Sequence, residues 1–176
     1  AGEDDQPSMA SGGWVHCFTA PRALSLRSGR LIARPYLPGL PLAPAQLRGT
    51  PTDEDGAVVA QLVDSRSWRL AFEASYEGPL SVRIGEESGL SITLEDGRLT
   101  VDLTGTRYPH GGRRVVTLEA GEARRVEILH DRSITEIYLG DGSRVFTTRS
   151  FLNGDGSGVS LTGAASVTNV SAARAD

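Results

Sequence analysis

Residues 126–149 read VEILHDRSITEIYLGDGSRVFTTR, and this stretch decides the fold class. It combines an apolar run at 126–129, a polar break at 130–133 and two β-prone runs that flank Asp141-Gly142. An Asp-Gly pair between such runs is a strong hairpin signal, because the turn requires residues with positive φ. The stretch therefore predicts a short strand followed by a β-hairpin.

The predicted Asp141-Gly142 hairpin carries apolar side chains on both of its faces. Its register places Tyr138 opposite Val145 on one face and Ile137 opposite Phe146 on the other. Apolar side chains on each face need an apolar neighbour. We therefore expect this hairpin to be covered on both sides, or to turn one face toward a partner domain.

Residues 90–103, LSITLEDGRLTVDL, predict a second hairpin with a well-defined register. With Asp96-Gly97 as a two-residue turn, six apolar side chains share one face, and a slip by one residue would mix the faces. The apolar face needs a second layer, which predicts an antiparallel two-sheet β-sandwich. The six predicted core residues are Leu90, Ile92, Leu94, Leu99, Val101 and Leu103.

Composition supports a soluble all-β chain without a nucleic-acid or membrane partner. The 176 residues are 39% hydrophobic and 23% charged, with 21 glycines and nine prolines, which favours many turns. No apolar run approaches the roughly 20 residues of a membrane span. The net charge of −4 argues against nucleic acid, and Arg113-Arg114 and Arg124-Arg125 are expected to be solvated strand ends.

Changes in composition divide the chain into four parts. Residues 1–13 predict a flexible lead, 14–35 a β segment, 36–49 a proline-rich linker and 50–176 the sandwich. The chain has no signal-peptide pattern and no initiating Met, as expected of a piece cut from a longer protein.

Two motifs resemble glycoside hydrolase family 32, the invertases, levanases and other β-fructosidases. The stretch 126–149 is similar to the signature of the family's accessory β-sandwich, and GWVHCFTAPRALSL at 13–26 is similar to its last propeller strand. Ala23 replaces the usual Glu, and His16-Cys17 is atypical. The resemblance implies a lectin-like jelly roll at 50–176, preceded at 14–35 by the last-blade strands of a truncated propeller.

By this resemblance the chain is a non-catalytic C-terminal module. Its parent would hydrolyse terminal β-fructosides of sucrose or fructans with retention, and the module would pack against the parent's catalytic propeller and aid oligomerisation in some members. The family's catalytic motifs, Asn-Asp-Pro, Arg-Asp-Pro and Glu-Cys, are absent from this chain. We therefore expect no catalytic residue, no cofactor and no metal. Two alternatives stay open, an independent lectin-like carbohydrate-binding module and an adhesion or purely structural sandwich.

Asp131 and Glu136 form the one tempting carboxylate pair. Glycoside hydrolysis requires two carboxyl groups about 5–5.5 Å apart for retention, or roughly 6.5–9.5 Å for inversion. Five residues apart across a turn, these two are expected to point to different places. The favoured interpretation is structural, with Asp131 bonding loop amides and Glu136 facing solvent or an arginine.

Metal and thiol chemistry have weak support. Residues 153–158, NGDGSG, imitate the start of a calcium loop, but Ala164 stands where an EF-hand needs a bidentate acid. His16, His110 and His130 lack ligand spacing. Cys17, the one cysteine, is expected to be a buried spectator thiol.

Few residues suggest sugar contacts. Tyr108 lies in a predicted surface loop and could contact a sugar, whereas Trp14 and Trp68 are more often buried strand anchors than stacking platforms. Asn169-Val170-Ser171 is a glycosylation sequon that matters only in a eukaryotic secreted protein.

The segment 14–34 predicts an edge that needs a partner. It carries Trp14, Val15, Phe18, Leu24 and Leu26, and a bare apolar β edge seeks another strand. We expect this segment to fold back on the sandwich, to pair with a second copy of the chain or to remain disordered. Pairing between copies is the preferred outcome.

Overall fold

The computed structural model describes residues 13, 16–40, 42–44, 66–85, 89–153 and 158–175. Within these residues the chain forms eleven β-strands and two three-residue 3-10 turns, and no helix is long and apolar enough to cross a membrane. The predicted all-β class is confirmed. The strands are β1 (Arg22–Arg27), β2 (Arg30–Pro35), β3 (Leu42–Pro44), β4 (Ser67–Ile84), β5 (Leu90–Glu95), β6 (Arg98–Asp102), β7 (Arg113–Thr117), β8 (Arg125–Asp131), β9 (Ile134–Leu139), β10 (Arg144–Arg149) and β11 (Val159–Ala175), and the 3-10 turns are η2 (Pro109–Gly111) and η3 (Glu122–Arg124).

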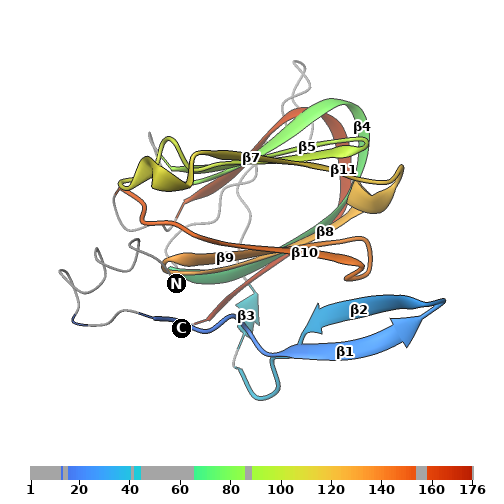
Figure 1. Ribbon diagram of the computed structural model, residues 1–176, viewed down its shortest axis with the longest axis horizontal. Helices are drawn as coiled ribbons and strands as arrows, with labels where there is room; N and C mark the ends of the chain where they lie inside the picture. The colour runs from blue at the N-terminus through green and yellow to red at the C-terminus, as the bar shows by residue number, and fades with distance from the viewer. Residues whose placement is uncertain are drawn as a thin grey trace.

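The sandwich is one nine-stranded antiparallel sheet that folds over on itself into two layers (Figure 1). The long strand β4 belongs to both layers, because its first part pairs with β8 and its last part pairs with β5. One layer continues through β8, β9 and β10, and the other through β5, β6 and β7. The strand β11 runs antiparallel to β4 along both layers and pairs at its far end with β3.

Glycine allows β11 to follow the bend of β4. The pairing of the two strands shifts register between Gly163 and Ala165. Gly163 has a φ of 145°, and a Cβ at this position would overlap the carbonyl oxygen of Pro79 in β4. Any larger residue would push the two strands apart at the corner where the sheet turns from one layer to the other.

The core lies between the layers and has the predicted register. Leu94 pairs with Leu99 and Ile92 with Val101. All six predicted core residues are at most 6% exposed, so the sandwich prediction is confirmed. Trp68 is 3% exposed and lies beside the His130 ring, at 5.2 Å between ring centroids, so it is a buried strand anchor as expected.

Candidate functional site: the hairpin latch

A separate two-stranded sheet, the hairpin β1–β2, packs across the outer face of β9 and β10 (Figure 1). The observed register pairs Tyr138 with Val145 and Ile137 with Phe146. Ile137 faces the core, and Tyr138 on the opposite face is only 2% exposed. The prediction that this strand pair is covered on both sides is confirmed, and the N-terminal segment is what covers the second side.

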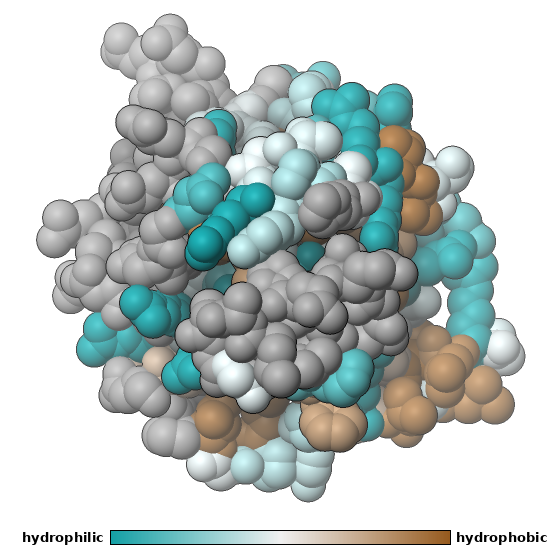
Figure 2. Space-filling view, turned by 60° about the vertical axis from the view of Figure 1, so that its left-hand side comes forward, coloured by the Kyte–Doolittle hydropathy of each residue, from teal (hydrophilic) through white to brown (hydrophobic). Residues whose placement is uncertain are grey.

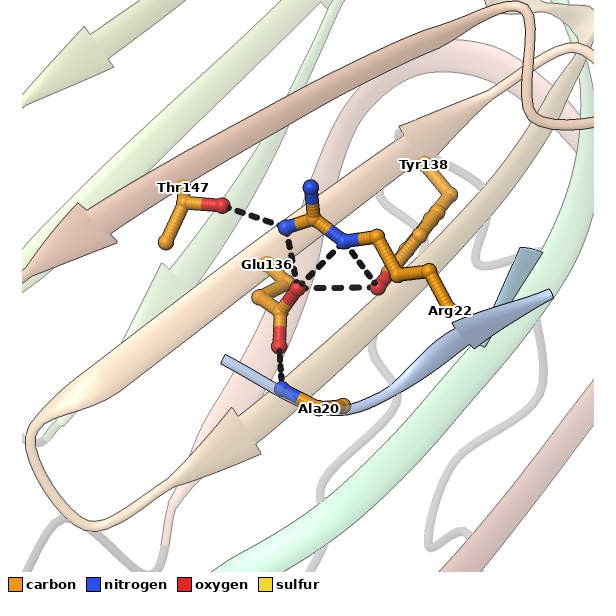
Figure 3. Close-up of polar contacts among 5 residues, drawn as sticks. All are labelled: Ala20, Arg22, Glu136, Tyr138 and Thr147. Atoms are coloured by element: carbon orange, nitrogen blue, oxygen red, sulfur yellow. Dashed lines mark hydrogen bonds and ion pairs between the residues drawn. The ribbon is translucent and has the colours of Figure 1, made fainter. Parts of the chain in front are cut away.

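The centre of this contact is a buried carboxylate that we call the Glu136 latch, formed by Ala20, Arg22, Glu136, Tyr138 and Thr147. The backbone N–H of Ala20 donates to Glu136 Oε1 at 2.6 Å. Arg22 donates to Glu136 Oε2 from Nη2 at 2.5 Å and from Nε at 3.2 Å, and the Tyr138 hydroxyl donates to the same oxygen at 2.8 Å. Arg22 Nη2 also donates to Thr147 Oγ1 at 2.8 Å, so one guanidinium joins two strands of the sandwich (Figure 3).

Burial makes the latch structurally important. The Glu136 side chain is 2% exposed and that of Arg22 27% exposed. An unpaired carboxylate at this depth would be strongly unfavourable, but here four donor atoms satisfy its two oxygens. Burial raises the pKa of Tyr138 to about 12, and the hydrogen bond to Glu136 is the second cause of this shift. The Tyr138 hydroxyl therefore keeps its proton and remains a donor. The site binds the hairpin to the sandwich, and both oxygens of its carboxylate are already engaged.

Every arginine of the hairpin pairs with an acidic residue of the sandwich. Arg27 and Arg34 contact the Asp141 carboxylate at 3.1 and 3.2 Å. Arg30 contacts Glu119 at 2.8 Å and lies 3.9 Å from Glu122. These pairs are largely exposed, so each one adds little by itself.

The Asp141-Gly142 turn also holds strand β2. The backbone N–H of Ala33 donates to the carbonyl oxygen of Gly142 at 2.9 Å. Gly142 has a φ of 101°, and a Cβ there would overlap the Ala33 carbonyl oxygen. The same Asp-Gly pair therefore closes the β9–β10 hairpin and permits the close approach of β2.

Asp131 and Glu136, the carboxylate pair singled out in the sequence, have separate structural partners. Asp131 and Glu136 border the same cavity of about 360 Å³, between residues 18–20 and the outer face of β4 and β8. Glu136 is bound by Arg22, one of the two surroundings expected. Asp131 accepts a hydrogen bond from the Ser67 hydroxyl at 2.6 Å, not from the loop amides we expected. The difference arises because Ser67 lies directly opposite Asp131 in the β4–β8 pairing.

Cys17 corrects a second expectation. The prediction of burial is wrong, because residues 16–19 run over the surface ahead of β1 and no described element covers them. Desolvation at the sulfur raises the pKa of the Cys17 thiol, and the charge of Asp131 adds to the effect. The thiol is therefore held in its protonated, weakly nucleophilic form.

The histidines are scattered. His130 is 2% exposed, with Nδ1 at 2.9 Å from Thr135 Oγ1, and burial lowers its pKa to about 4 against the opposing charge of Asp131. No group of three His, Cys, Asp or Glu side chains within the described ranges is arranged for a metal ion. The calcium-like loop at 153–158 falls mostly outside these ranges, as do Trp14, the side chain of His110 and nearly all of the predicted lead.

Surface residues singled out in the sequence have ordinary surroundings. The arginine pairs 113–114 and 124–125 are exposed at strand ends, as predicted. Tyr108, a possible sugar contact in the sequence, is half-buried edge-on against Phe151, at 5.6 Å between ring centroids. Asn169 donates from Nδ2 to Glu73 at 2.9 Å.

The outer faces of the described sandwich show no aromatic platform. Across β11, β4, β5 and β6 the register lines up four hydroxyl side chains, and β7 ends this row with Val115. The exposed aromatic residues of the described chain, Phe18 and Tyr36, both belong to the N-terminal region. The four hydroxyl residues are Thr162, Ser81, Thr93 and Thr100.

Curated relatives are larger enzymes. The chain is 29% identical over 161 residues to the sucrose-6-phosphate hydrolase of Pediococcus pentosaceus, covering 85% of this chain and 31% of that protein. It is 29% identical over 168 residues to the raffinose invertase of Escherichia coli, covering 90% of this chain and 34% of that protein. The chain thus spans about a third of the length of these relatives.

Solved structures agree on the fold. The glycoside hydrolase family 32 structure from Bifidobacterium adolescentis superposes with a TM-score of 0.67 at 18% identity, covering 90% of this chain and 25% of that one. The sucrose-6-phosphate hydrolase from Lactobacillus gasseri gives a TM-score of 0.65 at 15% identity, covering 88% and 33%. The family model for the C-terminal region of glycosyl hydrolases family 32 matches residues 46–175. The chain therefore belongs to glycosyl hydrolase family 32 and contains its C-terminal domain.

Proposed function

We propose that this chain is the accessory, non-catalytic module of an enzyme that hydrolyses terminal β-fructosides, such as those of sucrose or fructans, with retention. The observation that carries the proposal is the Glu136 latch. Among the described residues, the most deeply buried ion pair is the one that holds the preceding hairpin, and such a pair fixes the geometry of the joint between hairpin and sandwich. The relatives named sucrose-6-phosphate hydrolase and raffinose invertase support this substrate class.

We infer that the hairpin belongs to the catalytic side of that joint, as the last strands of the propeller. The family model begins at residue 46, after the hairpin. The matches to solved structures cover 88–90% of the chain, more than residues 46–175 alone can supply. The fold shared with those structures therefore extends into the N-terminal segment. The module's work in the parent is to pack against the propeller, with assembly of subunits as a secondary role.

A domain exchange tests this function. In a chimera, this chain replaces the part of the Pediococcus pentosaceus sucrose-6-phosphate hydrolase that it matches, 31% of that protein. We expect the chimera to hydrolyse sucrose 6-phosphate, and both this chain alone and the enzyme lacking the matched part to be inactive or nearly so. Turnover by the purified chain alone that is lost in Glu136→Gln would place catalysis in this chain and refute the proposal.

The carbohydrate-binding alternative has weaker support, because no aromatic platform lies on the described sandwich. Calorimetric titration of the chain with inulin and levan separates the two functions. We expect no saturable heat below millimolar sugar. Tight, saturable binding by the isolated chain would favour an independent binding module instead.

A further inference from the structure

The cavity of about 360 Å³ beside the Glu136 latch touches both ends of the hairpin. Residues 18–20 lead into β1, two leucines follow β2, and these segments border the cavity together with the outer face of β4, β8 and β9. Its volume falls within the range of small-molecule sites. Figure 2 shows apolar surface (brown) low on the molecule, the height at which the hairpin and its flanking segments lie in Figure 1. The large apolar side chains that border the cavity include Phe18, Leu37, Leu40, Leu129 and Ile134.

One carboxylate of this cavity lacks a cation. The two other charged groups that border it, the Glu136 carboxylate and the Arg69 guanidinium, are each held in an ion pair. Asp131 is exposed and accepts a hydrogen bond from the neutral Ser67 hydroxyl, and no arginine of the described chain forms an ion pair with it. The adjacent Arg132 does not border the cavity. The cavity therefore carries one uncompensated negative charge.

An aromatic ring at the same cavity is also free. Phe18 is 99% exposed, and within the described ranges neither a cation nor a second ring lies over it. The face of an aromatic ring attracts a cation, and so does an unpaired carboxylate. Apolar walls, a free ring and a single carboxylate together fit one chemical class, an organic ammonium ion with an apolar body.

A larger cavity lacks this combination. It measures about 590 Å³ and lies between β2 and the outer face of β4 and β8. Three arginines and three carboxylates border it, and they balance one another in ion pairs. Such a site offers no comparable attraction to a charged ligand. The pairs are Arg34–Asp141, Arg69–Glu127 and Arg125–Glu73.

From these observations we propose that the cavity beside the latch binds a small organic ammonium ion, and that the bound ligand stabilises docking of the hairpin. The ammonium group pairs with Asp131 and lies against the Phe18 ring. The apolar body fills the space between Leu37, Leu129 and Ile134. Because the ligand touches segments on both sides of the hairpin as well as the sandwich, it binds the docked arrangement and stabilises it by mass action. The site does not depend on the fructoside chemistry of the proposed function.

Titration of the full chain with 2-phenylethylammonium, followed by NMR in an amine-free buffer, tests the site. The signals of the Leu129 and Ile134 methyl groups should shift and saturate. The neutral isostere 2-phenylethanol should bind about 10-fold more weakly, because it lacks the charge that pairs with the carboxylate. Equal affinity for the two compounds, shifts confined to other residues or no saturable shift would each overturn the proposal.

Two variants test the role of the carboxylate. Asp131→Asn removes the charge and keeps an oxygen that can accept from Ser67. It should abolish the preference for the ammonium ion and leave the affinity for the alcohol unchanged. The control Glu77→Gln, at an exposed carboxylate of β4 that borders neither cavity, should leave both affinities unchanged. A preference that survives Asp131→Asn would show that another group binds the ammonium ion.

Hydrogen exchange tests whether the ligand stabilises docking. The Ala20 amide donates to Glu136 and the Ala33 amide to Gly142, so both amides exchange when the hairpin opens. At a ligand concentration ten times the Kd, exchange of both amides should slow roughly 10-fold. The same concentration should have much less effect in Asp131→Asn. Unchanged exchange of both amides at saturating ligand would overturn the link between the site and the hairpin.

Discussion

The sandwich and the hairpin are held together by opposite means. Among the described residues, the sandwich buries twenty-two apolar side chains in one continuous core. The hairpin buries a single apolar side chain, Ile32, and contributes four arginines that pair with acidic residues of the sandwich. Apolar burial is non-directional and scales with area, whereas ion pairs require particular geometry and weaken with salt.

The two regions therefore differ in role: the sandwich folds around its own core, whereas the hairpin docks onto the sandwich. The sandwich is stable through its own core, so it is expected to survive loss of the hairpin. The hairpin has too little apolar contact to hold its place without the Glu136 latch. Docking of the hairpin therefore depends on the electrostatic interactions of one buried site. Variants in the core and variants in the latch should consequently affect the two regions separately.

The largest effect is expected in the sandwich core. Leu94 is fully buried, and Leu94→Ala should lower the free energy of unfolding by about 2–5 kcal/mol through lost burial and the cavity left behind. Urea unfolding followed by tryptophan fluorescence measures this loss. The control Val115→Ala, at a half-exposed position, should stay within about 0.5 kcal/mol of the original chain. Equal losses in the two variants would contradict the described core.

Removal of Arg22 should release the hairpin and leave the sandwich folded. Arg22→Ala leaves the buried Glu136 carboxylate without its cation, a loss of roughly 3 kcal/mol that opening of the hairpin relieves by hydration. Trypsin cleavage at Arg30 should accelerate about 100-fold, with an unchanged urea midpoint. Arg27→Ala, which removes an exposed pair, should cost under about 1 kcal/mol. Equal release by both variants would show that the latch has no special role.

Acid should weaken the sandwich through His130. The pKa of His130 is lowered from 6.5 to about 4 by burial, so between these values the unfolded chain binds a proton that the folded chain does not. This stabilising contribution is complete above pH 6.5 and falls by roughly 3 kcal/mol as the pH drops to 4. His130→Gln should show a flatter dependence of unfolding free energy on pH. A variant curve parallel to that of the original chain would contradict the assignment.

The weakest expected effect is self-association of the isolated chain. Without a catalytic domain, the β1 edge should pair with a second copy at high concentration, in addition to folding back on the sandwich as observed. Sedimentation velocity should show a rising mean mass for the full chain. A version beginning at Gly49 and the Leu24→Lys/Leu26→Lys variant should both stay monomeric. Monomers throughout would mean that the exposed edge is inert.

Local sequence patterns predicted the sandwich because its strands carry period-two apolar alternation. The register around Asp96-Gly97 follows from six apolar positions, and any slip moves them to the wrong face. Strand β4 is harder to predict, since Gly78-Pro79 lies inside it and local rules would end the strand there. Pairing with β11 across the bend keeps the strand continuous.

The sequence predicted that β9 and β10 have a second cover, but it did not predict which residues form the latch. Apolar positions on both faces of β9 and β10 showed that a second cover exists. They could not show that Arg22, 114 residues away in sequence, provides its central contact. Cys17 was misplaced for a related reason: residue type favours burial, but exposure depends on whether another element passes over it. Long-range pairing of this kind has no local signature.

Strand β11 must be synthesised before either layer of this domain can be completed. Ala173 pairs with Arg69 and Val159 with Ile84, so each layer needs the last strand as the neighbour of β4. Contacts across such sequence separations form slowly, because the loop between them must close first. A ribosome-bound chain lacking residues 159–175 would hold β4 with one side open along both layers. Synthesis therefore leaves the domain incomplete until this strand emerges, and chaperone protection would matter most just before that moment.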